Sequence, residues 1–411
     1  MNRSFSSFFI IMCLFTVLCS REVEYRQISY EDYLDKVDGA WLGQMIGVTF
    51  GEPTEFRYQG KIVPFNLDYY YKHTGKGNKR QNYKRYTPDG APDQDDVYIE
   101  LLFLHCIKNY GINVTARQIA EEWLKRMDYN RVWHANKAAH TNFMKGIWPP
   151  ESGNPKYNRH ADDIDFQIES DLFGIISPGL PQESNRWCDK VGHIMNYGDG
   201  VYGGMFVAGM YTIAFFETDV QKIVSWGLRC IPKESRYAKV IRDVMDWHKQ
   251  YSDWTYTWNE LQKKWGNTDS CPDGKGKPFN IDAKMNGAYI VMGLLYGEGD
   301  FEKTINIAMR CGQDSDCNPS NAAGILGCSL GASGIPKKWK APMKDFIYNI
   351  SMKEIYPGRI PRIEIVKTTA EIGKQLIMKN GGKIIKKNGR EILNIPVQEP
   401  VPPKKLEISK W

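Results

Sequence analysis

The sequence lacks a long apolar segment after its first twenty residues. No later apolar run continues uninterrupted for the ~20 residues that a helix needs to cross a bilayer. We therefore expect the mature chain to be soluble, or tethered to a membrane only at its start.

Cysteine pairs and concentrated charge are also missing. Of the nine cysteines, Cys13 and Cys19 lie in the first segment, and the others follow no regular spacing and include no C-x-x-C pair. This pattern predicts neither a disulfide framework nor a cysteine-based zinc site. The formal net charge is +6 and the basic residues are scattered except after Ile360, so we expect no nucleic-acid partner.

The first twenty residues have the layout of an export signal. Arg3 precedes the apolar run Phe8 to Leu18, which is too short to span a bilayer and ends at Cys19. We expect residues 1–20 to be a signal peptide and the protein to be exported. Two interpretations stay open: a secretory signal, which gives a periplasmic or secreted protein, and a lipoprotein signal, which leaves an outer-membrane lipid anchor at Cys19.

Most of the chain repeats apolar residues at three- and four-residue intervals, which predicts helices. The predicted helices are Glu31 to Gly47, Val97 to Tyr110, Thr115 to Met127, Gly203 to Phe216, Asp219 to Cys230, Ser235 to Tyr251, Ala283 to Tyr296, Phe301 to Arg310 and Asn321 to Leu330. Pro53 to Gln94, Gly146 to Asp163 and Thr257 to Asp282 show no period and are predicted to be long surface loops, which inside a compact domain are usually functional.

The end of the chain has a different pattern. Lys383 to Val397 alternates apolar and polar residues around Asn388-Gly389, which predicts a β-hairpin. We expect a helical domain over residues 28–360, followed over residues 361–411 by a helix, the hairpin and a proline-bearing tail. The predicted fold class is all-α with this small β appendage.

A first acidic cluster, Asp93-Gln94-Asp95-Asp96, stands immediately before an apolar helix. One aspartate would cap that helix and complement its dipole. Three carboxylates within four residues repel one another unless a cation compensates their charge. For this cluster alone, both the helix cap and the metal site stay open.

A second cluster, Asp314-Ser315-Asp316-Cys317-Asn318, leads into a helix of small residues. Its spacing resembles the start of a calcium-binding loop, but Pro319 stands where such a loop needs Gly, and Ile325 where it needs a bidentate Glu. We expect instead a turn that points Asp314 and Asp316 at one ion.

The third feature is a glycine-rich helix. Gly39, Gly43 and Gly47 recur at four-residue intervals, which favours close approach of another helix. Glu55 follows, at the start of a long loop, where a carboxylate is free to face a cleft.

In this order on a helical chain, the three features resemble the ADP-ribosylglycohydrolase family. The resemblance extends from about Tyr30 to Trp339 and includes Ile164 to Asp171, Ser177 to Gly179 and Asn196 to Phe206. It implies an orthogonal α-helical bundle with two Mg²⁺ ions, or Mn²⁺, at the base of an ADP-ribose cleft.

The resemblance also implies ligands, with departures. Asp95, Asp96, Asp314 and Asp316 match the metal-binding aspartates of the family. Gln94 and Val97 stand where the family's first motif has threonines; Gln94 still offers a carbonyl oxygen, whereas Val97 cannot coordinate. Cys317 replaces a ligating threonine of many members, and a thiol is a poor ligand for a hard cation.

The implied activity is hydrolysis of an N- or O-glycosidic bond to ribose in a small-molecule or protein-linked ADP-ribosyl or ribosyl compound. Positive charge develops on the sugar during such a reaction, so nearby carboxylates stabilise its transition state. We expect Glu55 to act as general base or to position water, Asp96 to contribute to catalysis, and the metal to be held by the residues Gln94, Asp95, Asp96, Asp314, Asp316 and Cys317. We expect a monomer.

Two other functions stay open. The lost threonines also suit a protein that binds a nucleotide or sugar without cleaving it, and paired carboxylates on two ions also suit a phosphoesterase. The loop aromatics Trp133, His134, Trp148, Tyr157 and Trp187 are candidates for stacking on a base, although such residues more often anchor a loop.

Overall fold

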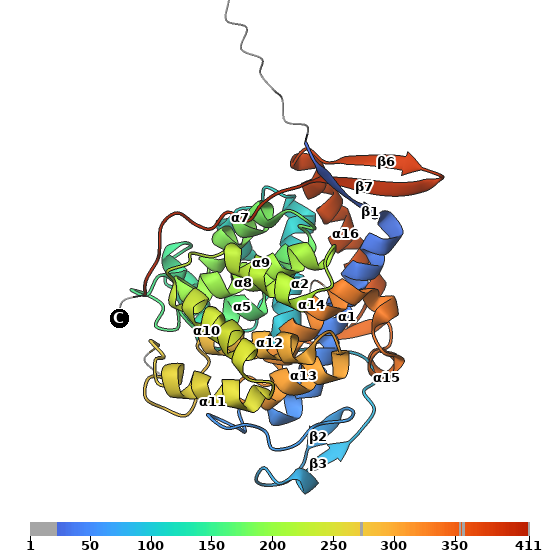
Figure 1. Cartoon of the computed structure of the whole chain (residues 1–411). Helices are drawn as coiled ribbons and strands as arrows, with labels where there is room; N and C mark the ends of the chain where they lie inside the picture. Colours follow the sequence, from blue (N-terminus) through green and yellow to red (C-terminus); the bar gives the residue numbers. More distant parts are fainter. Residues whose placement is uncertain (1–22, 272–273, 353–354, 356–357, 410–411) are drawn as a thin grey trace, which may run out of the picture.

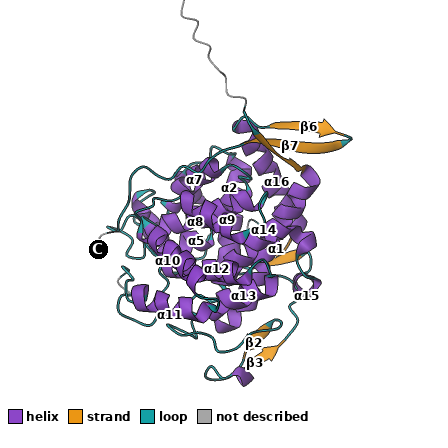
Figure 2. Ribbon diagram, viewed as in Figure 1, coloured by secondary structure: helices purple, strands orange, loops and turns teal. Residues whose placement is uncertain are grey.

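The protein is a helical bundle with small strand pairs at its periphery (Figures 1 and 2). The structure, a computed structural model, describes residues 23–271, 274–352, 355 and 358–409. The predicted signal peptide and the anchor at Cys19 lie outside the described residues. Within them, no helix combines the length and the apolar character that crossing a membrane would require.

The helices occur where the apolar periodicity predicts them and also at further positions. They are α1 (Tyr30–Gly51), α2 (Asp95–Tyr110), α3 (Ala116–Arg126), α4 (His134–Met144), α5 (Asp165–Ile168), α6 (Asp171–Ile175), α7 (Pro181–Gly192), α8 (Asp199–Ala214), α9 (Val220–Arg229), α10 (Arg236–Gln250), α11 (Trp254–Trp265), α12 (Ala283–Gly297), α13 (Phe301–Arg310), α14 (Cys317–Gly334), α15 (Lys337–Lys340) and α16 (Arg362–Lys379). The all-α prediction is confirmed. The prediction of a loop beginning at Thr257 is wrong, because α11 continues to Trp265.

Four helices form the centre of the bundle. In α8, α12, α14 and the second half of α1, almost every residue is buried. Helices of the outer layer, such as α9, α10 and α13, bury one face and leave the other polar. A helix buried all round must be apolar or small on every side, which explains why the central helices are rich in Gly and Ala.

Glycines bring α1 and α14 into backbone contact. A Cβ added to Gly43 would lie 2.2 Å from the carbonyl oxygen of Ala323, and one added to Gly47 equally close to that of Pro319. In the same way Gly39 lies against Gly327, and Gly51 against Ser315. The contacts on α14 move backwards as those on α1 move forwards, so the two helices run antiparallel. The packing role predicted for the glycines is confirmed, and the end of α1 lies beside the start of α14.

The predicted hairpin is present and gains a third strand. Strands β6 (Lys383–Lys387) and β7 (Arg390–Pro396) turn at Asn388 and Gly389, which both have positive φ. Strand β1 (Tyr25–Ser29) pairs antiparallel with β7, so the sheet order is β1-β7-β6. Two further pairs, β2 (Tyr71–His73) with β3 (Tyr83–Arg85) and β4 (Phe346–Asn349) with β5 (Gly358–Pro361), edge the bundle.

Candidate active site

The end of α1 carries Glu55 to the turn before α14. The hydroxyls of Thr54 and Ser315 lie 2.9 Å apart, and the backbone N–H of Phe56 donates to the Gln313 carbonyl at 2.9 Å. The early glutamate and the second acidic cluster are therefore neighbours, although about 260 residues separate them in sequence.

The first acidic cluster is tied to the same place. Asp96 accepts hydrogen bonds from the Val97 N–H at 3.0 Å and from the Ser320 hydroxyl, on α14, at 2.5 Å. The side chain of Gln94, the residue before α2, makes no capping hydrogen bond. The end of the glycine-rich helix and the two aspartate clusters therefore lie together in the structure.

A cavity of about 430 Å³ opens over these residues. It is lined by Glu55, Phe56, Asp93, Gln94, Asp95, Tyr98, Asn130, Arg131, Trp133, His134, Ile164, Asp165, Ile168, Ile281, Asp314 and Cys317. Asp96 and Asp316 are buried beneath it. Val97 is buried in the apolar core, away from the cavity lining.

The carboxylates at the cavity floor repel one another. Donor atoms of Asp314, Asp316 and Cys317 lie within 4.8 Å of each other. Burial raises the pKa of Asp314 and Asp316 well above the ordinary value, and the neighbouring carboxylates Glu55 and Asp314, respectively, raise them further. Asp316 Oδ1 is buried and has no hydrogen-bond partner among the described residues. Hard oxygen donors with uncompensated negative charge fit a divalent cation such as Mg²⁺.

Glu55 shares this electrostatic environment. The charge of Asp316, followed by burial, raises the pKa of Glu55 to about 9; Asp95 and Glu52 add to the shift and Arg57 opposes it. A cation at the aspartates would offset the largest of these causes and favour the ionised carboxylate.

Asp165 was missed as a site residue in the sequence. It lines the cavity at the start of α5, and its oxygens accept hydrogen bonds from the backbone N–H groups of Ala135 (3.2 Å) and Asn136 (3.1 Å). The available signal was a pair of acidic residues, Asp165 and Glu169, four positions apart and alternating with the apolar residues Ile164, Phe166 and Ile168. Glu169 is fully buried below it and accepts from Asn136.

Asp93, the remaining carboxylate of the first cluster, has a different partner. Arg131 donates to it at 2.7 Å, and the Ser351 hydroxyl donates to the same oxygen at 2.7 Å. Both Asp93 and Arg131 line the cavity, so this pair places a guanidinium at the cavity wall.

Only some of the aromatic residues predicted to stack on a base lie at the cavity. Trp133, which is 51 % exposed, and His134 line the cavity. Trp148 stacks on Phe143, and Trp187 is buried against Phe173. Tyr157 lies at a separate surface hollow.

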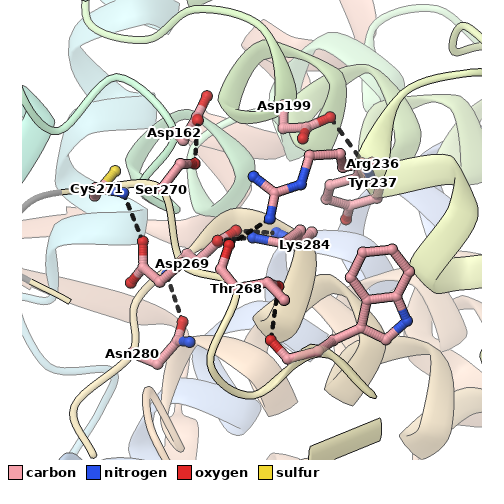
Figure 3. A network of polar contacts seen from close by, with 12 residues as sticks. Asp162, Asp199, Arg236, Tyr237, Thr268, Asp269, Ser270, Cys271, Asn280 and Lys284 are labelled. Atoms are coloured by element: carbon pink, nitrogen blue, oxygen red, sulfur yellow. Dashed lines mark hydrogen bonds and ion pairs between the residues drawn. The ribbon is translucent and has the colours of Figure 1, made fainter. Parts of the chain in front are cut away.

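A partly buried polar network ties Thr268 and Ser270 to neighbouring elements (Figure 3). Ser270 donates to Asp162 at 2.6 Å, Arg236 donates to the Thr268 carbonyl, and Lys284 forms an ion pair with Asp282. Burial lowers the pKa of Lys284 to about 8, and Arg236 adds to that shift. Ile281, shortly before α12, lines the cavity.

Comparisons with known proteins agree with the geometry. A family model described as ADP-ribosylglycohydrolase matches residues 29–365. One similar solved structure, described as "ADP-ribosylglycohydrolase-related protein complex", has a TM-score of 0.53 and 13 % identity, and covers 84 % of this chain and 99 % of that chain. No curated protein sequence matches. The structural likeness shows the fold, and the family model spans most of the chain.

Proposed function

The chain belongs to the ADP-ribosylglycohydrolase family, and we propose that it is a magnesium-dependent hydrolase that cleaves the N- or O-glycosidic bond to ribose in an ADP-ribosylated or related ribosyl compound. The observation that carries this proposal is the meeting of Glu55, Asp95 and Asp314 at one cavity, above the buried Asp96 and Asp316.

The cation site is formed by Asp95, Asp96, Asp314 and Asp316. Their oxygens suit Mg²⁺, and Mn²⁺ is the alternative ion. Bound there, such an ion supplies charge stabilisation and orients the ribose hydroxyls or water. Gln94 offers a weaker carbonyl ligand, while Cys317 lines the cavity as a thiol that a hard cation disfavours.

Glu55 is the base or water-positioning group. It faces the cavity next to the aspartates, and its ionisation responds to their charge. Carboxylates at this position also stabilise the positive charge that develops on the ribose. Asp96 is buried and accepts a hydrogen bond from Ser320 of α14, and it contributes to catalysis as a ligand of the cation.

The rest of the cavity suits a nucleotide-like substrate. Its volume of about 430 Å³ lies in the range of small-molecule sites. Trp133 offers an exposed ring at the mouth, and Arg131 offers a cation to an anionic group. Because we expect the protein to be exported, its substrate is a ribosyl compound or glycoconjugate met outside the cytoplasm.

The test is hydrolysis of a panel of ADP-ribosylated and simple ribosyl compounds with Mg²⁺ or EDTA. We expect Mg²⁺-dependent release of ADP-ribose or ribose, which Asp316→Ala abolishes together with metal binding. Asp246→Ala, at an exposed position on α10, is the matched control.

Three results would contradict the proposal. Full turnover by metal-stripped Asp316→Ala would remove the metal site from the mechanism. Binding without turnover across the panel would indicate a binding protein, and release of phosphate in place of a sugar product would indicate a phosphoesterase.

A further inference from the structure

A cluster of histidines and a carboxylate adjoins the cavity, beside the aspartates of the active site. It consists of His134, the first residue of α4, with His160 and Asp163 from the loop before α5. Donor atoms of the three side chains lie within 4.8 Å of one another, and His160 Nδ1 is 2.7 Å from an oxygen of Asp163.

The two imidazoles have the separation that one shared metal ion would require. Their ring centroids are 5.5 Å apart, with planes inclined by 70°. Two imidazoles bound to one tetrahedral Zn²⁺, at the usual Zn–N distance of about 2.0–2.1 Å, would have centroids about 5 Å apart. Only a small adjustment of the rings is therefore needed.

Asp163 supplies the second observation that points to a cation. Its side chain is 1 % exposed, and its Oδ1 is buried without a hydrogen-bond partner among the described residues. A buried carboxylate oxygen in that state is expensive unless an ion or a proton compensates it. Burial raises the pKa of Asp163 to about 6, with His160 opposing the shift.

The backbone holds His134 in an unusual conformation. Its φ is +35°, which costs free energy for a residue with a side chain. The next two N–H groups, of Ala135 and Asn136, donate to Asp165, so the start of α4 is fixed in place. Such support is typical of a side chain that must be aimed in one direction.

We propose that His134, His160 and Asp163 form a second metal site, for a divalent transition metal of the zinc class, separate from the aspartate site. Two imidazoles and one carboxylate are the ligand set of three-ligand zinc sites that keep a coordination position open, whereas Mg²⁺ prefers oxygen. An entry path exists, because His134 lines the main cavity and both histidines line a surface hollow of about 310 Å³.

A rival ligand set shares Asp163. Donor atoms of Asp269 and Cys271 are within 4.8 Å of it and of each other, on the loop drawn in Figure 3. Burial raises the pKa of the Cys271 thiol, and metal binding there would require that buried thiol to lose its proton. Imidazoles bind metal in the neutral form, which favours the histidine side.

The experiment is titration of the metal-stripped protein with Co²⁺, a spectroscopic substitute for Zn²⁺, in excess Mg²⁺. We expect one equivalent of Co²⁺ to bind with visible d–d absorption, and Zn²⁺ to displace it. His160→Ala should weaken binding by more than the roughly 10–100-fold that loss of an outer-shell partner costs, because a direct ligand is removed, while the matched control His248→Ala leaves it unchanged. The Asp316→Ala protein should keep the full Co²⁺ signal, because the aspartate site is separate.

Circular dichroism verifies that each variant is folded, and His134→Gln repeats the test if His160→Ala is not. Unchanged Co²⁺ affinity in the folded histidine variants would overturn the proposal, as would absence of Co²⁺ binding by the wild type. A thiolate-to-cobalt charge-transfer band that Cys271→Ser removes would place the ion on the rival ligands and would also overturn it.

Discussion

The charge of one residue, Glu55, depends on groups that are distant in sequence. Asp316 is the largest cause of its raised pKa, ahead of burial, and Asp95 contributes as well. A carboxyl with this environment is protonated at neutral pH until the aspartates are neutralised. Its activity as a base is thus linked to occupation of the aspartate site.

Replacing Glu55 with Gln should therefore reduce turnover while leaving the fold intact. We expect kcat to fall by roughly 10²–10⁴-fold, the usual contribution of a general base, with KM nearly unchanged. Glu364→Gln, at an exposed position in the first turn of α16, is the control. Steady-state kinetics in saturating Mg²⁺ measures both, and a Glu55→Gln enzyme with wild-type kcat would exclude the role.

Among the helices, α1 and α14 determine whether the site exists. Their backbones touch along four glycine positions of α1, and this contact carries Glu55 to the turn that holds Asp314 and Asp316. A side chain at the contact would meet backbone atoms, which cannot move away as a flexible side chain can.

Gly43→Ala is expected to destabilise the protein and to separate the two halves of the site. The added Cβ would lie 2.2 Å from the Ala323 oxygen, so the free energy of unfolding should fall by roughly 1–3 kcal/mol or more. Gly334→Ala, at an exposed position at the end of α14, is the control. Urea unfolding measures the difference, and equal stability of the two variants would contradict the close contact.

The tail after β7 is a second element with a testable attachment. It runs along α7, where the side chains of Gln182 and Asn185 donate hydrogen bonds to its backbone (Figure 1). Further along the tail, Glu407 lies 3.0 Å from His193 Nε2. Burial favours neutral His193, but Glu407 and Asp189 outweigh it and raise the net pKa. Burial opposes ionisation of Glu407, but its contact with His193 lowers the net pKa.

These shifts predict a pH window for docking of residues 397–409. The raised pKa of His193 gives stability that is present below pH ~6.5 and is lost as pH rises through its folded value. The lowered pKa of Glu407 gives stability that is present above pH ~4.3 and is lost as pH falls through its folded value. Protection of the tail from hydrogen exchange, measured relative to the intrinsic exchange rate at each pH, should be greatest within that window, and His193→Gln should remove the loss on the alkaline side. An unchanged pH profile in this variant would exclude the ion pair as the cause.

At the scale of the whole molecule, the sequence predicted the class of fold and most of the helices. The spacing of apolar residues predicted both end residues of α13 correctly. It did not indicate α11, because the many polar and aromatic residues of that helix obscure the three- and four-residue spacing. The partner strand β1 was also missed, since its pairing with β7 depends on tertiary contact across the full chain length.

The site was predictable where acidic residues stand together or where a residue, such as Glu55, follows a recognisable helix at the start of a long loop. Asp95, Asp96, Asp314 and Asp316 form visible clusters, and the structure brings them together with Glu55; their catalytic and metal-binding roles stay predictions. Arg131 reaches the cavity as a single residue without a motif, and the spacing of Asp165 and Glu169 does not show that Asp165 faces the cavity, so their contribution depends on packing that local sequence does not encode.

The most direct test of the account is thermal unfolding of the wild type and Asp316→Asn, each with EDTA and with Mg²⁺. A carboxyl with a raised pKa lowers stability above its ordinary pKa, so in EDTA Asp316→Asn should melt roughly 2 °C or more above the wild type. Mg²⁺ at 100 times its Kd should stabilise the wild type by about 2.7 kcal/mol and leave Asp316→Asn unchanged. An equal Mg²⁺-induced shift in both proteins would contradict the claim that these converging aspartates hold the ion.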